Sequence, residues 1–144
     1  MNSLKMLYAL ILLIAAFLTG CSTNSNDILV EMEFKSLNKD TQSFIEGMSG
    51  SNGIFLYNTV NKDQFIIVSY AYVVQGEDAK YLDAISADIT NRSLIINLEE
   101  MNTNQYDDDR LKTIRIFKIT NTKEYDQIQI FKNGEETAFT AVGG

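Results

Sequence analysis

The stretch from Phe65 to Val74 constrains the fold more than any other part of this sequence. It is apolar almost throughout, and in an extended strand successive side chains point to opposite sides. One side then carries Ile66, Val68, Tyr70, Tyr72 and Val74, and the other carries Phe65, Ile67, Ser69, Ala71 and Val73. A strand with two largely apolar sides is covered on both of them. The sequence therefore predicts a central strand here.

Alternation of apolar and polar residues recurs along the rest of the chain after residue 27. It predicts further strands over residues 28–35, 53–60, 81–89, 93–98, 113–119, 127–131 and 137–142. Residues 81–89 also fit a helix, but their neighbours favour a strand. A short helix is expected near residues 41–48, where Ser43 and Glu46 have capping-box spacing. Asn133-Gly134 predicts a two-residue hairpin turn.

Short strands joined by hairpin-length turns are typical of all-β folds. We therefore expect residues 28–144 to form one all-β domain, an antiparallel β-sandwich of about seven to eight short strands. The alternative is a lipocalin-like up-and-down β-barrel, which can enclose a small ligand.

The N-terminal segment has the layout of a secretory signal. Lys5 precedes an uninterrupted apolar run over residues 6–18, which is shorter than the roughly 17–25 residues of a membrane-spanning helix. The run ends in Leu18-Thr19-Gly20-Cys21, which resembles the lipobox of bacterial lipoproteins at all four positions. An ordinary secretory signal, or an uncleaved anchor, is the alternative.

The lipobox resemblance implies the processing and the location of the chain. Cleavage would fall between Gly20 and Cys21 and remove residues 1–20 as a signal peptide, and the Cys21 sulfur would carry a diacylglyceryl group. Residues 21–27 would then be the lipidated cysteine and a flexible polar tether. The domain would be held on the cell membrane by its lipid, facing outside the cytoplasm. Cys21 is the single cysteine, so no intramolecular disulfide competes for it.

Charge and composition narrow the classes of partner and of chemistry. The net charge of −7 becomes −8 when residues 1–20, whose one charged residue is Lys5, are removed. An acidic domain is poorly suited to nucleic acid, whose affinity comes mainly from Lys and Arg contacts to phosphate. The sequence has no His, the commonest general base and transition-metal ligand. We expect no cofactor and no nucleic-acid partner.

A second resemblance begins at Gly53 and covers about the last two thirds of the expected domain. It is a strand pattern carried by Phe65–Val68, Leu94–Leu98, Arg115–Ile119 and Ile128–Gly134. In this pattern the chain is similar to the C-terminal domain of the bacterial protease-stability lipoproteins and to related small hypothetical lipoproteins. Gln75–Asp78 stands where that family commonly has a Thr-Gly-Gly-Tyr turn. The resemblance implies a non-enzymatic β-domain that binds or stabilises another envelope protein.

Three groups of residues are candidates for chemistry. The run Asp107–Asp109 offers oxygen ligands for Ca²⁺, but successive residues converge poorly, and a solvated loop is the expectation. Glu99 and Glu100, a carboxylate pair of the glycosidase type, should face opposite sides of a strand. The third group can line a ligand pocket or an interface, or pack at the edge of the core; it comprises Tyr57, Tyr70, Tyr72 and Tyr81.

These observations favour a non-catalytic membrane-anchored lipoprotein that binds or stabilises a cell-envelope protein. The alternative is a lipocalin-like carrier of a small apolar ligand. A cavity lined by the tyrosines would favour the carrier. A filled core with an exposed apolar patch would favour the protein partner.

Overall fold

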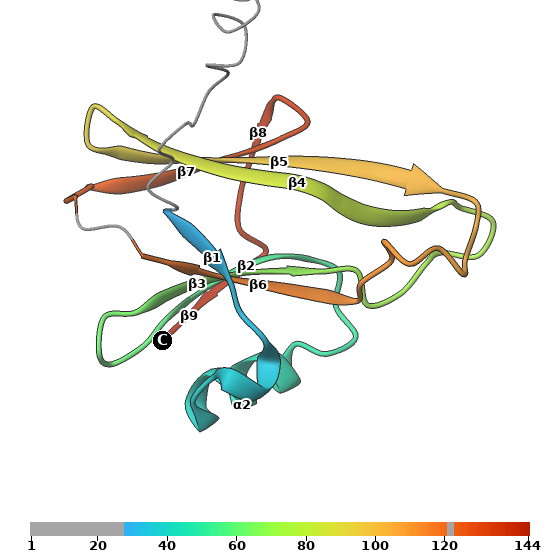
Figure 1. Cartoon of the computed structure of the whole chain (residues 1–144), viewed down its shortest axis with the longest axis horizontal. Helices are drawn as coiled ribbons and strands as arrows, with labels where there is room; N and C mark the ends of the chain where they lie inside the picture. The colour runs from blue at the N-terminus through green and yellow to red at the C-terminus, as the bar shows by residue number, and fades with distance from the viewer. Residues whose placement is uncertain (1–27, 121–122) are drawn as a thin grey trace, which may run out of the picture.

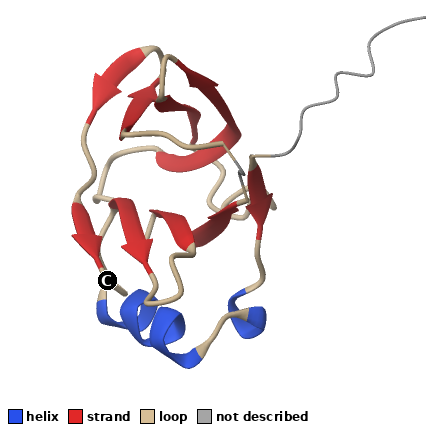
Figure 2. Ribbon diagram, turned by 90° about the vertical axis from the view of Figure 1, so that its left-hand side faces the viewer, coloured by secondary structure: helices blue, strands red, loops and turns tan. Residues whose placement is uncertain are grey.

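The computed structural model describes residues 28–120 and 123–144, so the expected signal peptide, Cys21 and the tether lie outside the described residues. In the described part, strands form two sheets stacked face to face, and a helix lies on the outer side of one sheet (Figures 1 and 2). This confirms the prediction of an all-β sandwich. The elements are β1 (Leu29–Glu31), η1 (Phe34–Ser36), α2 (Lys39–Gly47), β2 (Gly53–Asn58), β3 (Gln64–Ser69), β4 (Ala79–Thr90), β5 (Ser93–Thr103), β6 (Ile114–Ile119), β7 (Gln127–Lys132), β8 (Glu135–Thr137) and β9 (Ala141–Gly143).

The five-stranded sheet has the order β1-β6-β3-β2-β9, which makes β3 its central strand as predicted. Ile66 and Ile67, which point to opposite faces of β3, are both fully buried. Ile66 packs between the two sheets against Leu94 and Ile96 of β5. Ile67 packs on the outer face, in the cluster that includes Ile45 of α2. The two apolar sides of this strand therefore support two separate clusters.

The four-stranded sheet has the order β4-β5-β7-β8. The long β4–β5 hairpin turns at Asn91 and Arg92, whose φ angles are +50° and +61°. Asn133 and Gly134, at +52° and +82°, form the predicted turn between β7 and β8. Positive φ at both turn residues matches the right-handed twist of the flanking strands. Residues 81–89 lie within β4, which confirms the strand interpretation.

Two features of the predicted sheets are wrong. The sheets are mixed, because β2 pairs with β9 in parallel and β5 pairs with β7 in parallel. In both cases the chain crosses to the other sheet before it returns, so the returning strand is free to run in the same direction. The lipocalin-like barrel is not formed either. Each sheet keeps two edge strands, β1 and β9 in one and β4 and β8 in the other.

Several predicted strands differ from the structure at their ends, among them the strand predicted over residues 93–98, which extends to Thr103 in β5. The first strand ends at Glu31, because the chain turns into η1 with a hydrogen bond from the Ser36 N–H to the Glu33 carbonyl oxygen (2.9 Å). The central strand ends at Ser69 instead of Val74. The expected last strand over residues 137–142 is divided into β8 and β9, which belong to different sheets.

Helix α2 begins earlier than the capping-box spacing of Ser43 and Glu46 predicted. The side chain of Asn38 accepts a hydrogen bond from the backbone N–H of Thr41 at 2.8 Å and thereby caps the helix. One turn later, Ile45 is 2% exposed and packs on the five-stranded sheet. The helix therefore closes the second apolar cluster from outside the sandwich.

Candidate functional site

The most distinctive surface lies at one end of the sandwich, where the β3–β4 connection (residues 70–78) meets the β5–β6 connection (residues 104–113) (Figure 1). The Tyr106 hydroxyl donates a hydrogen bond to the Glu77 carbonyl oxygen at 3.0 Å. The Tyr70 N–H donates to the Thr113 carbonyl oxygen at 2.8 Å. These two hydrogen bonds hold the connections against each other.

Asn52, just before β2, adds two further hydrogen bonds to the β3–β4 connection. Its side-chain oxygen accepts from the Tyr72 N–H at 3.1 Å, and its side-chain nitrogen donates to the Tyr72 carbonyl oxygen at 2.9 Å. Both backbone groups of Tyr72 are therefore satisfied without a neighbouring strand. Tyr72 itself is 54% exposed.

Large apolar side chains are exposed on both of these connections. We call them the loop-end patch, defined as Tyr72, Val73, Val74 and Tyr106. Between 45% and 63% of each residue is exposed. Single exposed apolar residues are ordinary, but a group of them on loops fixed by hydrogen bonds is a candidate interaction surface.

Beside this patch, a small pocket opens between the two sheets. We call it the end pocket. It has a volume of 230 Å³, and Ile54, Val68 and Leu98 supply its apolar walls. Polar residues from several strands complete it: Asn52, Ser69, Tyr70, Lys80, Glu100 and Lys132.

One carboxylate between two lysines organises the polar side of the end pocket. Lys80 Nζ lies 3.6 Å from one carboxylate oxygen of Glu100, and Lys132 Nζ lies 3.9 Å from the other. The Glu100 side chain is only 12% exposed. Its backbone N–H donates at 2.8 Å to the side chain of Asn133, which follows Lys132 in the chain. The β7–β8 turn thus places the second lysine beside the carboxylate.

Two hydroxyl groups lie at the same pocket. Burial, followed by the charge of the Glu100 carboxylate and a hydrogen bond to it, raises the pKa of the Tyr70 hydroxyl above its ordinary value. Tyr70 is therefore a neutral hydrogen-bond donor at any physiological pH. Ser69 is 1% exposed, and its Oγ has no hydrogen-bond partner among the described residues. A buried polar group without a partner is uncommon and needs an explanation.

The structure separates the four tyrosines that the sequence singled out. Tyr70 and Tyr72 lie together at the loop end of the sandwich. Tyr57 stacks on Phe44 of α2 with ring centroids 4.5 Å apart, on the outer side of the five-stranded sheet. Tyr81 is 3% exposed and lies under the guanidinium of Arg110 at 4.5 Å.

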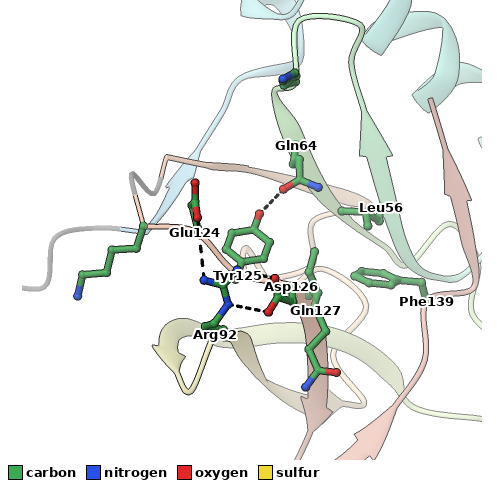
Figure 3. Close-up of a pocket in the computed structure, with 11 residues that line it drawn as sticks. Leu56, Gln64, Arg92, Glu124, Tyr125, Asp126, Gln127 and Phe139 are labelled. Carbon is green, nitrogen blue, oxygen red and sulfur yellow. Dashed lines mark hydrogen bonds and ion pairs between the residues drawn. The ribbon is translucent and has the colours of Figure 1, made fainter.

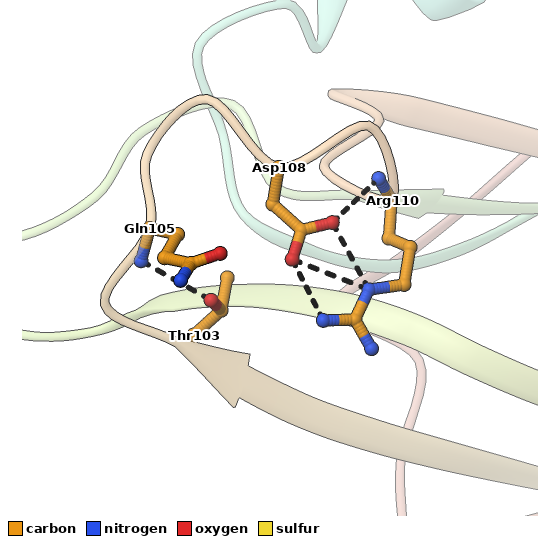
Figure 4. Close-up of polar contacts among 4 residues, drawn as sticks. All are labelled: Thr103, Gln105, Asp108 and Arg110. Carbon is orange, nitrogen blue, oxygen red and sulfur yellow. Dashed lines mark hydrogen bonds and ion pairs between the residues drawn. The ribbon is translucent and has the colours of Figure 1, made fainter.

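The acidic run Asp107–Asp109 lies in the β5–β6 connection. Its middle residue, Asp108, forms an ion pair with the neighbouring Arg110 (Figure 4). Asp108 accepts hydrogen bonds from the side chain of Arg110 at 2.7 and 3.0 Å and from its backbone N–H at 2.9 Å. These bonds lower the pKa of Asp108 to about 2. Asp108 therefore braces the loop that carries Tyr106. Glu99 and Glu100 occupy successive positions of β5, Glu99 exposed and Glu100 at the end pocket.

A second hollow, with a volume of 910 Å³, lies at the opposite end of the sandwich (Figure 3). Leu56 and Phe139 form its apolar floor. At its rim, Arg92 makes a two-point ion pair with Asp126 at 2.7 and 2.8 Å, so its charge is already matched.

Comparisons with protein-family models, with curated proteins and with solved structures found no match to this chain. The two resemblances stated above therefore rest on the residues alone. Among the residues that the structure describes, no helix has the length and apolar character needed to cross a membrane.

The sequence located only part of this site. Tyr70 and Tyr72 were identified by their amphipathic character, and Glu100 only as a member of a carboxylate pair. Lys80 and Lys132 were missed, because their proximity to Glu100 depends on the register of β4 and β7 against β5. A single lysine next to a predicted strand forms no sequence pattern from which an ion pair could be predicted.

Proposed function

We propose that this protein is a lipid-anchored, non-catalytic envelope lipoprotein that binds or stabilises another envelope protein through the loop-end patch. The observation that carries the proposal is the exposure of Tyr72, Val73, Val74 and Tyr106 on two connections joined by hydrogen bonds. Tyrosine is enriched at the centres of protein interfaces, where its ring is buried and its hydroxyl keeps a partner.

The filled core supports a protein partner over an enclosed apolar ligand. Ile66, Leu94 and Ile96 are fully buried between the sheets, and they occupy the space that a carrier would keep open. The apolar side chains that follow Ser69 in the sequence, Tyr72 to Val74, lie on the surface and not in the core. Connections that are already fixed lose little conformational freedom on binding, which favours affinity.

The expected anchor would increase the chance of contact with such a partner. A diacylglyceryl group on Cys21 would confine the domain to the membrane surface, where other anchored proteins reach a high effective concentration. The negative net charge of the chain disfavours nucleic acid and polybasic attachment to anionic lipid. Attachment would rest on the acyl chains, of which two or more bind stably.

The test combines the anchor and the patch in living cells. Cys21→Ala should prevent incorporation of radiolabelled fatty acid and leave the precursor uncleaved. A Val73→Ser, Tyr106→Ser double variant should be processed normally but lose the protein that co-purifies with the parent chain after cross-linking. Val60→Ser is the matched control, because Val60 is 98% exposed at the opposite end of the sandwich.

Two results would contradict the proposal. Equal fatty-acid labelling of the parent chain and Cys21→Ala would exclude the lipobox. Co-purification of the same protein with the patch variant and with the Val60→Ser control would exclude the loop-end patch as the binding surface.

A further inference from the structure

We propose that the end pocket binds a small organic carboxylate with a short apolar body. Its carboxylate would contact the ammonium groups of Lys80 and Lys132, and its body would lie against Ile54, Val68 and Leu98. This site is distinct from the protein-binding patch beside it, and the inference does not rest on the proposed function.

The charges at the pocket favour an anion. Lys80 and Lys132 both pair with the single carboxylate of Glu100, so among the charged residues that line the pocket the cations outnumber the anions by one. Their distances of 3.6 and 3.9 Å exceed the roughly 2.7–2.9 Å of a charge-assisted hydrogen bond. Each ammonium group has three donors, so both retain donors for a ligand.

Hydrogen bonds around Glu100 fix the backbone that carries Lys132. The Asn133 side chain accepts from the Glu100 N–H at 2.8 Å and donates to the Glu100 carbonyl oxygen at 3.2 Å. The Asn133 N–H donates to the Leu98 carbonyl oxygen at 2.9 Å. Lys132 is therefore fixed beside β5 by the turn that follows it.

The walls define the rest of the ligand. Ile54, Val68 and Leu98, each at most 7% exposed, offer apolar contact, and Ser69 on the same wall has a buried hydroxyl without a partner. The volume of 230 Å³ is below the roughly 300–1,000 Å³ of pockets that hold drug-sized ligands, so we expect a small ligand. Hexanoate, which has one carboxylate and a short apolar body, is a suitable probe.

Binding of hexanoate is measured by titration calorimetry with the full chain in lipid nanodiscs, and empty nanodiscs give the blank. We expect saturable binding to one site. Lys80→Gln and Lys132→Gln should each weaken it about tenfold or more, because a charge-assisted hydrogen bond is lost. Lys39→Gln is the matched control, since it removes the same charge on α2, outside the sandwich. This control should leave hexanoate binding unchanged.

Two further probes keep the test valid if a lysine variant fails to fold. Hexan-1-ol has the same body without the charge, and acetate has the charge without the body, so both should bind the parent chain at least about tenfold more weakly. Absence of saturable hexanoate binding would overturn the proposal. Equal binding of hexan-1-ol, equal binding of acetate, or an equal loss in Lys39→Gln would overturn it as well.

Discussion

The Tyr106 hydroxyl donates a hydrogen bond to the Glu77 carbonyl oxygen at 3.0 Å, and this contact joins two loops that are far apart in the sequence. Glu77 belongs to a turn in which its N–H donates to the Val74 carbonyl oxygen, also at 3.0 Å. The exposed Val74 and the exposed ring of Tyr106 are therefore linked through one residue. The loop-end patch is presented by braced loops instead of by free ends of strands.

Tyr106→Phe should loosen this brace with little effect on global stability. The ring stays, but a hydrogen bond worth about 0.5–1.5 kcal/mol is removed at an exposed position. Hydrogen exchange should become faster in residues 104–113, while the free energy of unfolding changes by less than about 1.5 kcal/mol. Tyr72→Phe is the control, because no hydrogen bond is formed by the Tyr72 hydroxyl among the described residues. Equal exchange in both variants would contradict the brace.

Arg115→Met should destabilise the sandwich by about 1–3 kcal/mol in urea unfolding, because it leaves polar partners without their donor. From β6, Arg115 donates to the Leu82 carbonyl oxygen of β4 at 3.0 Å and to both carboxylate oxygens of Glu31 at 2.7 and 2.8 Å. It thus connects the two sheets and the edge strand β1. Lys118→Met on the same strand removes only the partly exposed ion pair with Asp63, so it should cost less than about 1 kcal/mol. Similar losses in the two variants would exclude a special role for Arg115.

The Glu31–Arg115 pair should also make stability depend on acid pH. A hydrogen bond from Arg115 lowers the pKa of the Glu31 carboxyl below its ordinary value. The stabilisation is then fully present above the unfolded-state pKa, which is about 4.3, and is lost as the pH falls through the lower folded-state pKa. Unfolding in urea at a series of pH values should show a smaller loss below about pH 4.3 in Glu31→Gln than in the parent chain. Parallel pH profiles would contradict this linkage.

Gly143→Ala and Gly47→Ala should have effects of opposite sign on thermal stability. A Cβ at Gly143 would overlap the ring of Phe44, which stacks on Tyr57, so we expect a loss of about 1–3 kcal/mol. A Cβ at Gly47, in the last turn of α2, would meet no atom within 4 Å. There the higher helix propensity of alanine should stabilise by about 0.5–1 kcal/mol. A stable Gly143→Ala variant would show that β9 is not pressed against the helix.

The central strand shows how far the alternation pattern determines the fold. Ile66 and Ile67 identified β3 and its two covered faces, because a period of two is a local property of the chain. The same pattern continues to Val74, yet the strand ends at Ser69. Its partners β2 and β6 have their ends at Gly53 and Ile114, directly opposite Ser69. Beyond that point one backbone hydrogen bond follows, from the Tyr70 N–H to the Thr113 carbonyl oxygen, and the side chain of Asn52 then pairs with the backbone of Tyr72.

The division of the C-terminal segment into two strands and the residues of the end pocket could not be predicted from the sequence, for a related reason. Residues 137–142 read as one strand, but the chain crosses between the sheets, and the Thr140 N–H donates to the Ile54 carbonyl oxygen at 2.7 Å. The pairing partner of β9 is β2, which is far away in the sequence. Likewise, Glu100 meets Lys80 and Lys132 only through strand register. Local periodicity predicts strands, whereas long-range pairing decides which side chains meet.

The central claim is that the loop-end patch contacts one envelope protein. Site-specific photo-cross-linking in living cells tests it most directly, with the reactive side chain placed at Val73 or at the more exposed control position Val60. We predict a single recurring cross-linked protein from position 73, its yield reduced by Tyr106→Ser, and none of this product from position 60. The same products from both positions, or no product from position 73, would contradict the account.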